Sequence, residues 1–542
     1  MIRLGVPMRQ LVVSILIVLG LAAGAVRGQS LKALQPTTGV SSNTVQTLAA
    51  EGDSLWAGPL LTVYVEAEEQ LFFAEGEVVE QRLLEGGHVV ISLATGGGAG
   101  AASSLWAGLA FEAGGGAIGA GGFLVSTDGG RSFEARPAPL DAAADTAVAY
   151  GVSTLPAVPV TQEAGAYPRG LALQGRDTVW AASGRAGLRR STDRGTSWTR
   201  VVLPPDTSTR IVPSQSYDFL AAPPQGDGRG FQNYRALSVL VDETGTVWAG
   251  TVAGLNRSAP SDVAPGGDRA WRLFRAEGGP TGLPGQIVPA LAEQPRPNAR
   301  NPVWVATLRT ETDGPLQRSG LAVTPDGGAT FRQALLGVQV NDVAARQGRV
   351  YAAAESGLYV SDDQGATWRT IETVRLASDE EGLLGGLTAR AVEVTPSALW
   401  VGTTEGLLRL DRPEEPRLLP DNSDASPPQW QLFRTEVPVN PEAPTEQVPD
   451  VETYAYPNPF VPSRDGGVRI VYDVPAPQPV TVSIYDFGMN RVRTLRDDEP
   501  EGRQEMLWDG TDGSGLRLPT GTYLYTVEVG GETVRGKILL TN

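Results

Sequence analysis

The side chains with the greatest chemical potential in this sequence are carboxylates. The 542 residues include 61 Asp and Glu, a single histidine, His88, and no cysteine. The lack of cysteine excludes disulfides, thiolate metal sites, cysteine nucleophiles and a lipid anchor on an N-terminal cysteine. A Ser-His-Asp triad would have to use His88. This residue precedes the apolar run 89–91 of a predicted inner strand, so we expect it to be structural.

Paired carboxylates would suit glycoside hydrolysis, which needs two carboxyl groups about 5–9.5 Å apart, one of them with a raised pKa. No spacing in the sequence singles out such a pair, so no catalytic residue is predicted. No metal or cofactor site is predicted either. The net charge of −17 disfavours generic binding to nucleic acid or to anionic lipid.

Four carboxylates recur in one pattern, Ser/Thr-x-Asp-x-Gly-x-Ser/Thr-Trp/Phe. They lie in the segments Ser126–Phe133, Ser191–Trp198, Thr324–Phe331 and Ser361–Trp368. Within a turn, an Asp can accept backbone N–H bonds, and a Gly can supply a positive φ. One carboxylate per turn is too few for calcium, which takes about 6–8 oxygens. We therefore expect a structural role. The pattern resembles the Asp-box of bacterial neuraminidase repeats and related β-propellers.

The elements that carry these turns repeat along the chain. A hydrophobic residue, an aromatic ring and two small residues occur together seven times, with the ring at Trp56, Trp106, Trp180, Trp248, Trp304, Tyr351 and Trp400. Each repeat contains four short predicted strands, and a strand-rich repeat of roughly 40–50 residues is typical of a β-propeller. The sequence predicts an all-β fold, with a seven-bladed propeller over residues 41–434. Each blade is expected to use one contiguous stretch, so the circle closes by packing blade one on blade seven.

In a propeller, the loops from first to second and from third to fourth strand share one rim, where the Asp-containing turns must lie. The insertions Arg136–Arg169, Leu203–Arg235 and Ala276–Gln286 follow fourth strands and are predicted on the opposite rim. Long loops on a rigid scaffold often carry function. The predicted binding residues are the aromatics of the two longer insertions, Tyr150, Tyr167, Tyr217, Phe219, Phe231 and Tyr234. The alternative is that these loops have no binding role.

The N-terminus predicts export. Arg3 and Arg9 precede the apolar run Leu11–Ala23, which is typical of a signal peptide over residues 1–28, cleaved after Ala25 or Gly28. No other apolar run is long enough to span a bilayer, so no transmembrane segment is expected in the mature chain. We expect export through the inner membrane to an extracellular or outer-surface location, with the periplasm as the alternative.

The C-terminal part has a different composition. Residues 435–450 are rich in proline and acid and predict a linker. Residues 451–542 contain alternating strands separated by turns and predict a small Ig-like β-sandwich of about seven strands. The motifs P-N-P-F, I-Y-D, W-D-G-x-D-x-x-G and G-T-Y-L-Y resemble the Ig-like domain of the flagellar hook-capping protein, which is similar to the C-terminal sorting domains of type IX secretion cargo. The resemblance implies secretion or surface attachment, with outer-membrane secretion machinery as a partner.

Two functions follow from these patterns. The first is a secreted or cell-surface, non-enzymatic propeller that binds a protein or glycan through its long-loop rim. The alternative is a secreted glycoside hydrolase of the Asp-box propeller type. A sialidase would carry Arg-Ile-Pro near the first blade, and the nearest string here, Arg210–Pro213, does not match. A third candidate, an assembly factor resembling photosystem-stability propellers, is disfavoured by the sandwich. Repeats four and seven, which lack the Asp-containing turn, resemble the propellers of hybrid two-component regulators.

Overall fold

The structure is a computed structural model. It describes residues 35–540 except 38–43, 53, 67–69, 75–76, 97–103, 114–116, 223–231, 311–315, 347, 378–382, 412–427, 434–438, 441–442, 448–452, 457, 459, 461, 463–466, 487 and 501. The predicted signal peptide, residues 1–28, lies outside the described residues, as does most of the predicted linker, 435–450. Within that linker, β35 (Val439–Asn440) pairs with β36 (Ala443–Gln447).

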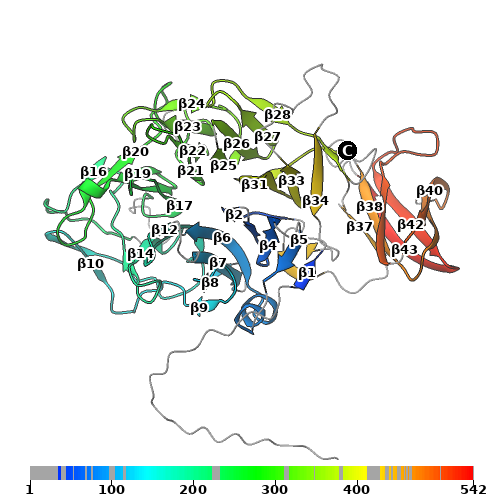
Figure 1. The fold of residues 1–542 in the computed structure, drawn as a ribbon, viewed down its shortest axis with the longest axis horizontal. Coiled ribbons are helices and arrows are strands. Elements are labelled where there is room, and N and C mark those ends of the chain that lie inside the picture. The colour runs from blue at the N-terminus through cyan, green and yellow to red at the C-terminus, as the bar shows by residue number, and fades with distance from the viewer. Residues whose placement is uncertain are drawn as a thin grey trace, which may run out of the picture.

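The described chain is almost entirely β-structure, as the sequence predicts, and forms a β-propeller followed by an Ig-like sandwich (Figure 1). Seven sheets each contain four consecutive antiparallel strands in the described part of residues 48–433. We number these blades one to seven. The strands of blades one to three are β2–β5 (Leu48–Glu51, Ser54–Ala57, Thr62–Val65, Gln70–Phe73), β6–β9 (Val89–Gly96, Ser104–Glu112, Ile118–Ser126, Glu134–Arg136) and β12–β15 (Pro168–Gln174, Thr178–Ser183, Gly187–Ser191, Thr199–Arg200).

Blades four to seven continue the pattern. Their strands are β17–β20 (Ala236–Val241, Val247–Thr251, Gly254–Ser258, Trp271–Phe274), β21–β24 (Leu291–Glu293, Val303–Thr307, Gly320–Thr324, Arg332–Ala334), β25–β28 (Val340–Arg346, Arg349–Ala354, Gly357–Ser361, Arg369–Ile371) and β31–β34 (Ala389–Val394, Ala398–Thr403, Leu407–Asp411, Gln429–Phe433). The innermost strands contact one another in the cyclic order β2, β6, β12, β17, β21, β25, β31 and back to β2.

Several elements outside the four-strand pattern were not predicted. β1 (Gln35–Thr37) pairs with β5 and so begins before the predicted propeller boundary at residue 41. β16 (Arg210–Ile211) pairs with β20 at the outer edge of blade four. β29 (Val374–Leu376) lies parallel to β34 and also pairs with β30 (Leu383–Leu384). The short helices are α1 (Glu77–Val79), η2 (Glu80–Glu85) and η3 (Pro260–Asp262), and β10 (Ala147–Tyr150) forms a hairpin with β11 (Ser153–Pro156).

Blade seven packs directly on blade one, and no described strand is exchanged between them. The Val45 N–H donates to the Thr403 carbonyl over 2.9 Å. The rings of Tyr64 and Trp400 meet edge-on, with centroids 4.7 Å apart. Arg409 of blade seven forms an ion pair with Glu66 of blade one over 2.9 Å. A backbone bond, an aromatic contact and an ion pair therefore close the circle.

The Asp-containing turns hold themselves together through local hydrogen bonds. In the turn of blade three, the Ser191 hydroxyl donates to Asp193 Oδ1 over 2.8 Å. The Ser197 backbone and hydroxyl donate to the two oxygens of the same carboxylate over 2.8 and 2.6 Å. These bonds lower the pKa of Asp193 to about 2. The same set recurs at Asp128, Asp326 and Asp363. The carboxylates are therefore committed to their own turns.

The Asp-containing turn of one blade packs on the repeat aromatic ring of the blade before it. We call this ring, which fills the space between two blades, the aromatic wedge. Gly195, in the turn of blade three, has φ +74, and a Cβ there would lie 2.6 Å from Cη2 of Trp106 in blade two. Trp198 of the same turn meets the Trp106 ring edge-on at 6.4 Å. Blades one and two are joined in this way through Gly130 and Trp56, and blades five and six through Gly365 and Trp304. These three turns therefore cover the repeat aromatic ring of the preceding blade, whereas the turn of blade five packs its Gly328 and Phe331 on Phe274 of β20.

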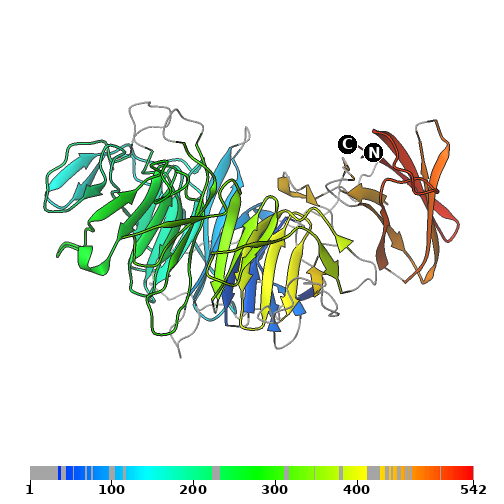
Figure 2. The same cartoon turned by 90° about the horizontal axis from the view of Figure 1, so that it is seen from above.

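The C-terminal domain is a sandwich of two sheets, seen from a second direction in Figure 2. One sheet has the order β37 (Thr453–Tyr456), β38 (Val468–Val474), β41 (Gly502–Trp508). The other has the order β40 (Arg491–Glu499), β39 (Gln478–Tyr485), β42 (Gly521–Val529), β43 (Glu532–Leu540). Trp508 and Tyr523 are buried in its core with ring centroids 5.4 Å apart. No helix in the described part of the chain is long and apolar enough to cross a bilayer.

Candidate functional site

The first long insertion does not stay on the rim predicted for it. Its hairpin β10–β11 lies outside the circle of blades (Figures 1 and 2). The Tyr150 hydroxyl donates to the Arg269 carbonyl over 2.9 Å, and the Gly151 N–H donates to Asp268 over 2.7 Å. These two acceptors precede β20, in the loop between the third and fourth strands of blade four. The insertion therefore wraps around blade three and reaches the rim that carries the Asp-containing turns.

Most of the predicted binding residues in the insertions form packing contacts instead. Tyr150 is 2% exposed and Tyr234 is 9% exposed, so both rings are packed inside the protein and neither is presented on the surface of the predicted rim. Tyr217 lies 6.1 Å from both Tyr150 and Phe219, between ring centroids, in the partly buried shell of the same cluster. An insertion of this length must build its own apolar core, and its aromatic residues supply it.

Two further predicted residues have different positions. Tyr167 is half-buried, and the Arg169 guanidinium lies 5.0 Å from its ring centroid and donates to its hydroxyl. Phe231 lies outside the described residues. His88 is structural, as expected, since its Nδ1 is 2.9 Å from the Arg82 carbonyl and its ring packs on Phe111. Within the described ranges, no cluster of three or more His, Asp or Glu side chains is arranged to hold a metal ion.

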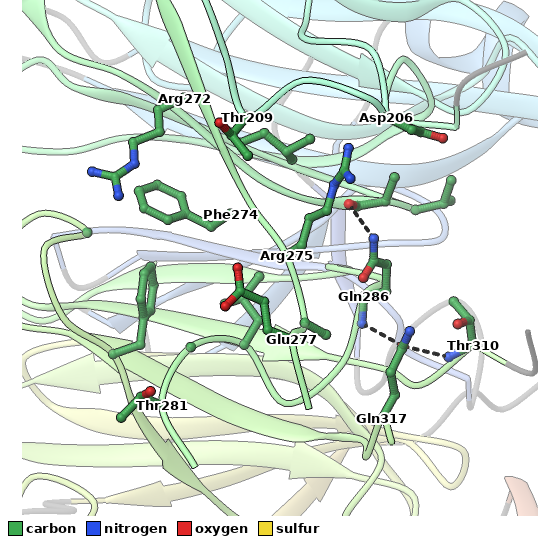
Figure 3. Close-up of a pocket in the computed structure, with 18 of the residues that line it drawn as sticks. Asp206, Thr209, Arg272, Phe274, Arg275, Glu277, Thr281, Gln286, Thr310 and Gln317 are labelled. Carbon is green, nitrogen blue, oxygen red and sulfur yellow. Dashed lines mark hydrogen bonds between the residues drawn. The ribbon is translucent and has the colours of Figure 1, made fainter. Parts of the chain in front are cut away.

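A cavity of about 1070 Å³ lies along the outer strand β20, between blades four and five (Figure 3). We call it the β20 groove. Its walls include both later insertions and the Asp-containing turn of blade five. The side chains that line it include Asp206, Arg272, Phe274, Arg275, Glu277, Thr281, Gln286, Gln317 and Phe331. The groove brings together side chains from both later insertions, from β20 and from the Asp-containing turn of blade five.

The second insertion is held against the groove by one carboxylate. Asp206 accepts the N–H groups of Gln232 and Asn233 over 2.7 and 3.0 Å, which ties the two ends of the insertion together. Asn233 is fully buried and exchanges amide hydrogen bonds with Asn256 of β19 over 2.8 and 2.9 Å. Because both oxygens of Asp206 have these partners, its first role is to position the wall.

Amides and aromatic rings form the rest of the wall. Gln286 donates its side-chain amide to the Ala253 carbonyl over 2.8 Å and its backbone N–H to Gln317 over 3.1 Å (Figure 3). Phe274 and Phe331 meet at 5.1 Å between centroids, and the Arg272 guanidinium lies 4.7 Å from the Phe274 centroid. Arg275 has two buried guanidinium nitrogens, Nε and Nη2, without a partner among the described residues.

The groove therefore presents both polar and apolar side chains. Arg272 and Arg275 balance the carboxylates of Asp206 and Glu277, so no strong field of one sign forms. Fixed amides next to apolar rings suit a ligand that carries hydroxyl or amide groups beside apolar surface. Glu277 and Arg272 are exposed and available to such a ligand.

A second pair of carboxylates lies on the innermost strands of blades six and seven. Asp342 accepts the Val392 N–H over 3.0 Å, so it satisfies a donor on the free edge of β31. Glu393 accepts the N–H of Val394 over 2.9 Å. Burial raises the pKa of Asp342 to about 6, and burial with the nearby Asp342 charge raises the pKa of Glu393 to about 7. Nothing in the sequence indicates this pair, because its two members belong to different repeats.

These raised pKa values predict a pH-dependent stability. The folded protein holds the Glu393 proton more tightly than the unfolded chain, whose ordinary value is 4.5. The free energy of unfolding should therefore fall as pH rises from about 4.5 to about 7. We expect Glu393→Gln to be more stable than the parent at pH 8 by about 1–2 kcal/mol, after allowance for partial exposure, and unchanged at pH 4. Urea titrations across this range measure it, with the exposed Glu163→Gln as control; equal effects of both variants would contradict it.

A comparison with known protein families identifies the C-terminal domain. Residues 461–532 match the FlgD Ig-like domain. A search of curated proteins finds no match to this chain. The solved structure of PorZ, a bacterial surface component of the type-IX secretion system of Porphyromonas gingivalis, is 14% identical with a TM-score of 0.39. That match covers 92% of this chain but only 59% of the PorZ chain. The fold and the domain match thus define a β-propeller protein with a C-terminal FlgD Ig-like domain.

Two other solved structures also match this chain. The GH74 xyloglucanase from Xanthomonas campestris is 14% identical over 95% of this chain and 74% of that chain, with a TM-score of 0.49. YCF48 from Cyanidioschyzon merolae is 16% identical over 71% of this chain and 100% of that chain, with a TM-score of 0.41. At this low identity, and with TM-scores below 0.5, these two matches carry no argument about this chain.

Proposed function

We propose that this protein is an exported, non-enzymatic binding protein that takes a glycan in the β20 groove. The single observation that carries the proposal is the wall of the groove, where fixed amides and two phenyl rings lie beside exposed Arg272 and Glu277. Sugars present hydroxyl groups on their edges and apolar C–H surface on their faces, and this wall offers partners for both. A protein segment is the alternative ligand of the same rim.

A glycan array with the purified chain tests this proposal. We expect binding to a restricted set of glycans, and a loss of at least about tenfold in affinity for the Arg272→Ala/Thr281→Ala double variant, whose exposed side chains line the groove. Arg176→Ala, which alters an exposed arginine of blade three away from the groove, is the matched control. If no glycan binds and a cell-envelope protein binds through the same two residues, the ligand is a protein segment instead.

A glycoside hydrolase is the second candidate function, because two carboxylates, Asp206 and Glu277, line one groove together with Arg275. Such an enzyme needs a carboxyl pair free to act on the glycosidic bond. Both Asp206 oxygens instead accept backbone N–H groups. Release of reducing sugar that Glu277→Gln abolishes would establish the enzyme and overturn the binding proposal.

We further propose that the C-terminal sandwich directs secretion or surface attachment and that the protein reaches the outer surface or the medium. The match of residues 461–532 to the FlgD Ig-like domain supports a separate, appended module. Deleting residues 451–542 should leave the propeller folded and move the protein from the outer surface or medium into the periplasm, as cell fractionation would show. Unchanged export of the truncated chain would contradict this role.

A further inference from the structure

Blade four lacks the Asp-containing turn, so the buried Trp180 ring of blade three is covered by arginine side chains instead of a glycine turn. Blades two, three and six each cover the wedge of the preceding blade with the glycine and aromatic ring of an Asp-containing turn. Blade four has no such turn, so Trp180 of blade three has no glycine cap. Two arginines take that place, and the guanidinium carbons of Arg190 and Arg269 lie 5.5 and 5.2 Å from the Trp180 centroid.

The missing turn also leaves a cavity of about 490 Å³ beside Trp180, which we call the Trp180 pocket. Its floor is blade three, its side is the loop that contains Arg269, and the first insertion closes it through Tyr150 and Asp141. The insertion is anchored here by the Tyr150–Arg269 hydrogen bond described above. The pocket therefore has walls from three separate segments of the chain.

Four arginines line this pocket, and they fall into two pairs. Asp141 neutralises one pair: it accepts two hydrogen bonds from Arg189, over 2.6 and 2.9 Å, and is also bonded to Arg200. The remaining acids of the lining have other partners, since Asp145 accepts the Ala142 N–H over 2.9 Å and Asp268 accepts the Gly151 N–H over 2.7 Å.

In the second pair, neither Arg190 nor Arg269 forms an ion pair with a carboxylate among the described residues, and only the charge of Asp262 partly offsets that of Arg269. The Arg190 side chain has no hydrogen-bond acceptor there, and its Nε is buried. Arg269 is 8% exposed, and its single acceptor is the Ser258 carbonyl, 3.4 Å from Nη1. Burial, together with the charge of Arg190, lowers the pKa of Arg269 to about 10. Burying two positive guanidinium groups beside one ring, with unused N–H donors, costs free energy. A bound anion would reduce this cost, because it would neutralise the charge and accept the hydrogen bonds.

We propose that the Trp180 pocket binds a small oxyanion, the phosphate, sulfate or carboxylate group of a ligand, between Arg190 and Arg269. Guanidinium groups offer paired N–H donors that match the oxygens of such anions. The pocket lies on the rim of the Asp-containing turns, and it is separate from the β20 groove. Failure of glycan binding in the groove would therefore leave this inference intact.

Isothermal titration calorimetry of the full chain at low ionic strength tests the inference, with inorganic phosphate, sulfate and acetate as separate probes. We expect saturable binding of at least one anion, and a rise in melting temperature with its concentration. Arg190→Gln and Arg269→Gln should each weaken that binding at least about tenfold. The control is Arg194→Gln, an exposed neighbour outside the pocket that pairs with Asp177.

The three probes distinguish the ligand chemistry. Binding of phosphate and sulfate without acetate assigns a tetrahedral anion, whereas binding of acetate alone assigns a carboxylate. Because Arg269 is buried, its variant is first checked for native circular dichroism, and Arg190→Gln carries the test if that variant is unfolded. The inference is overturned if no anion gives a saturable signal up to tens of millimolar, or if folded Arg190→Gln binds as tightly as the parent.

Discussion

Gly195→Ala is expected to lower the free energy of unfolding by about 2–5 kcal/mol, a large effect for the addition of one methyl group. The first reason is the backbone, because Gly195 has φ +74, which an alanine adopts at a cost. The second is space: the new Cβ would stand 2.6 Å from Cη2 of Trp106, and that ring is 2% exposed and packed on every side. Chemical denaturation followed by circular dichroism measures the change.

Gly175→Ala is the matched control for this prediction. Gly175 belongs to the same blade and has φ +68, but no atom lies within 4 Å of a Cβ built there. Its substitution should lower the free energy of unfolding by only about 1–2 kcal/mol, the cost of placing an alanine at a positive φ. If the two variants lose equal stability, the wedge of blade two does not depend on the turn of blade three, and the interlock described above is wrong.

Trp400→Ala should have the second large effect, about 3–5 kcal/mol of unfolding free energy, because it removes a fully buried ring. This ring lies where blade seven meets blade one, in contact with Tyr64 at 4.7 Å and stacked on Phe433 at 6.0 Å. Among the described strands none is exchanged to close the circle, so side-chain packing carries much of the closure. Hydrogen exchange should therefore accelerate first in blades one and seven.

An exposed apolar residue provides the comparison for Trp400. Leu336 is 45% exposed, and Leu336→Ala should change the unfolding free energy by less than about 0.5 kcal/mol. A Trp400→Ala protein that loses protection evenly in all blades would indicate that closure is not local to this seam. Closure by packing between blades one and seven would then be an inadequate description of the circle.

The sequence predicted the scaffold well because its signals are local and repeated. The aromatic wedges fill the spaces between blades, as expected, and Trp304 and Trp400 are fully buried. The turn carboxylates have the short-range partners that their spacing suggests, as Asp193 shows with Ser191 and Ser197. The turn carboxylate lies two residues after one hydroxyl side chain and four residues before another. Such short spacings determine which groups can form hydrogen bonds, so these contacts can be predicted without the rest of the fold.

The candidate sites could not be predicted in the same way. The sequence favoured Tyr150 and Tyr234 as binding residues because they are aromatic and lie in long insertions, yet both are buried. Nothing local shows that Tyr150 would cross blade three and bond to Arg269, 119 residues away. For the same reason, the β20 groove, the Trp180 pocket and the Asp342–Glu393 pair were not foreseen.

The sequence by itself thus determined an all-β propeller with an Ig-like domain after it, and the residues of the wedges and turns, because periodic short-range patterns specify strands and hairpins. Only the tertiary structure decided which charges stay unpaired. Arg189 and Arg190 are adjacent in the sequence, but Asp141 reaches one of them and no described acid reaches the other. Such pairing depends on how an insertion folds over the outside of a blade, and sequence spacing does not encode that path.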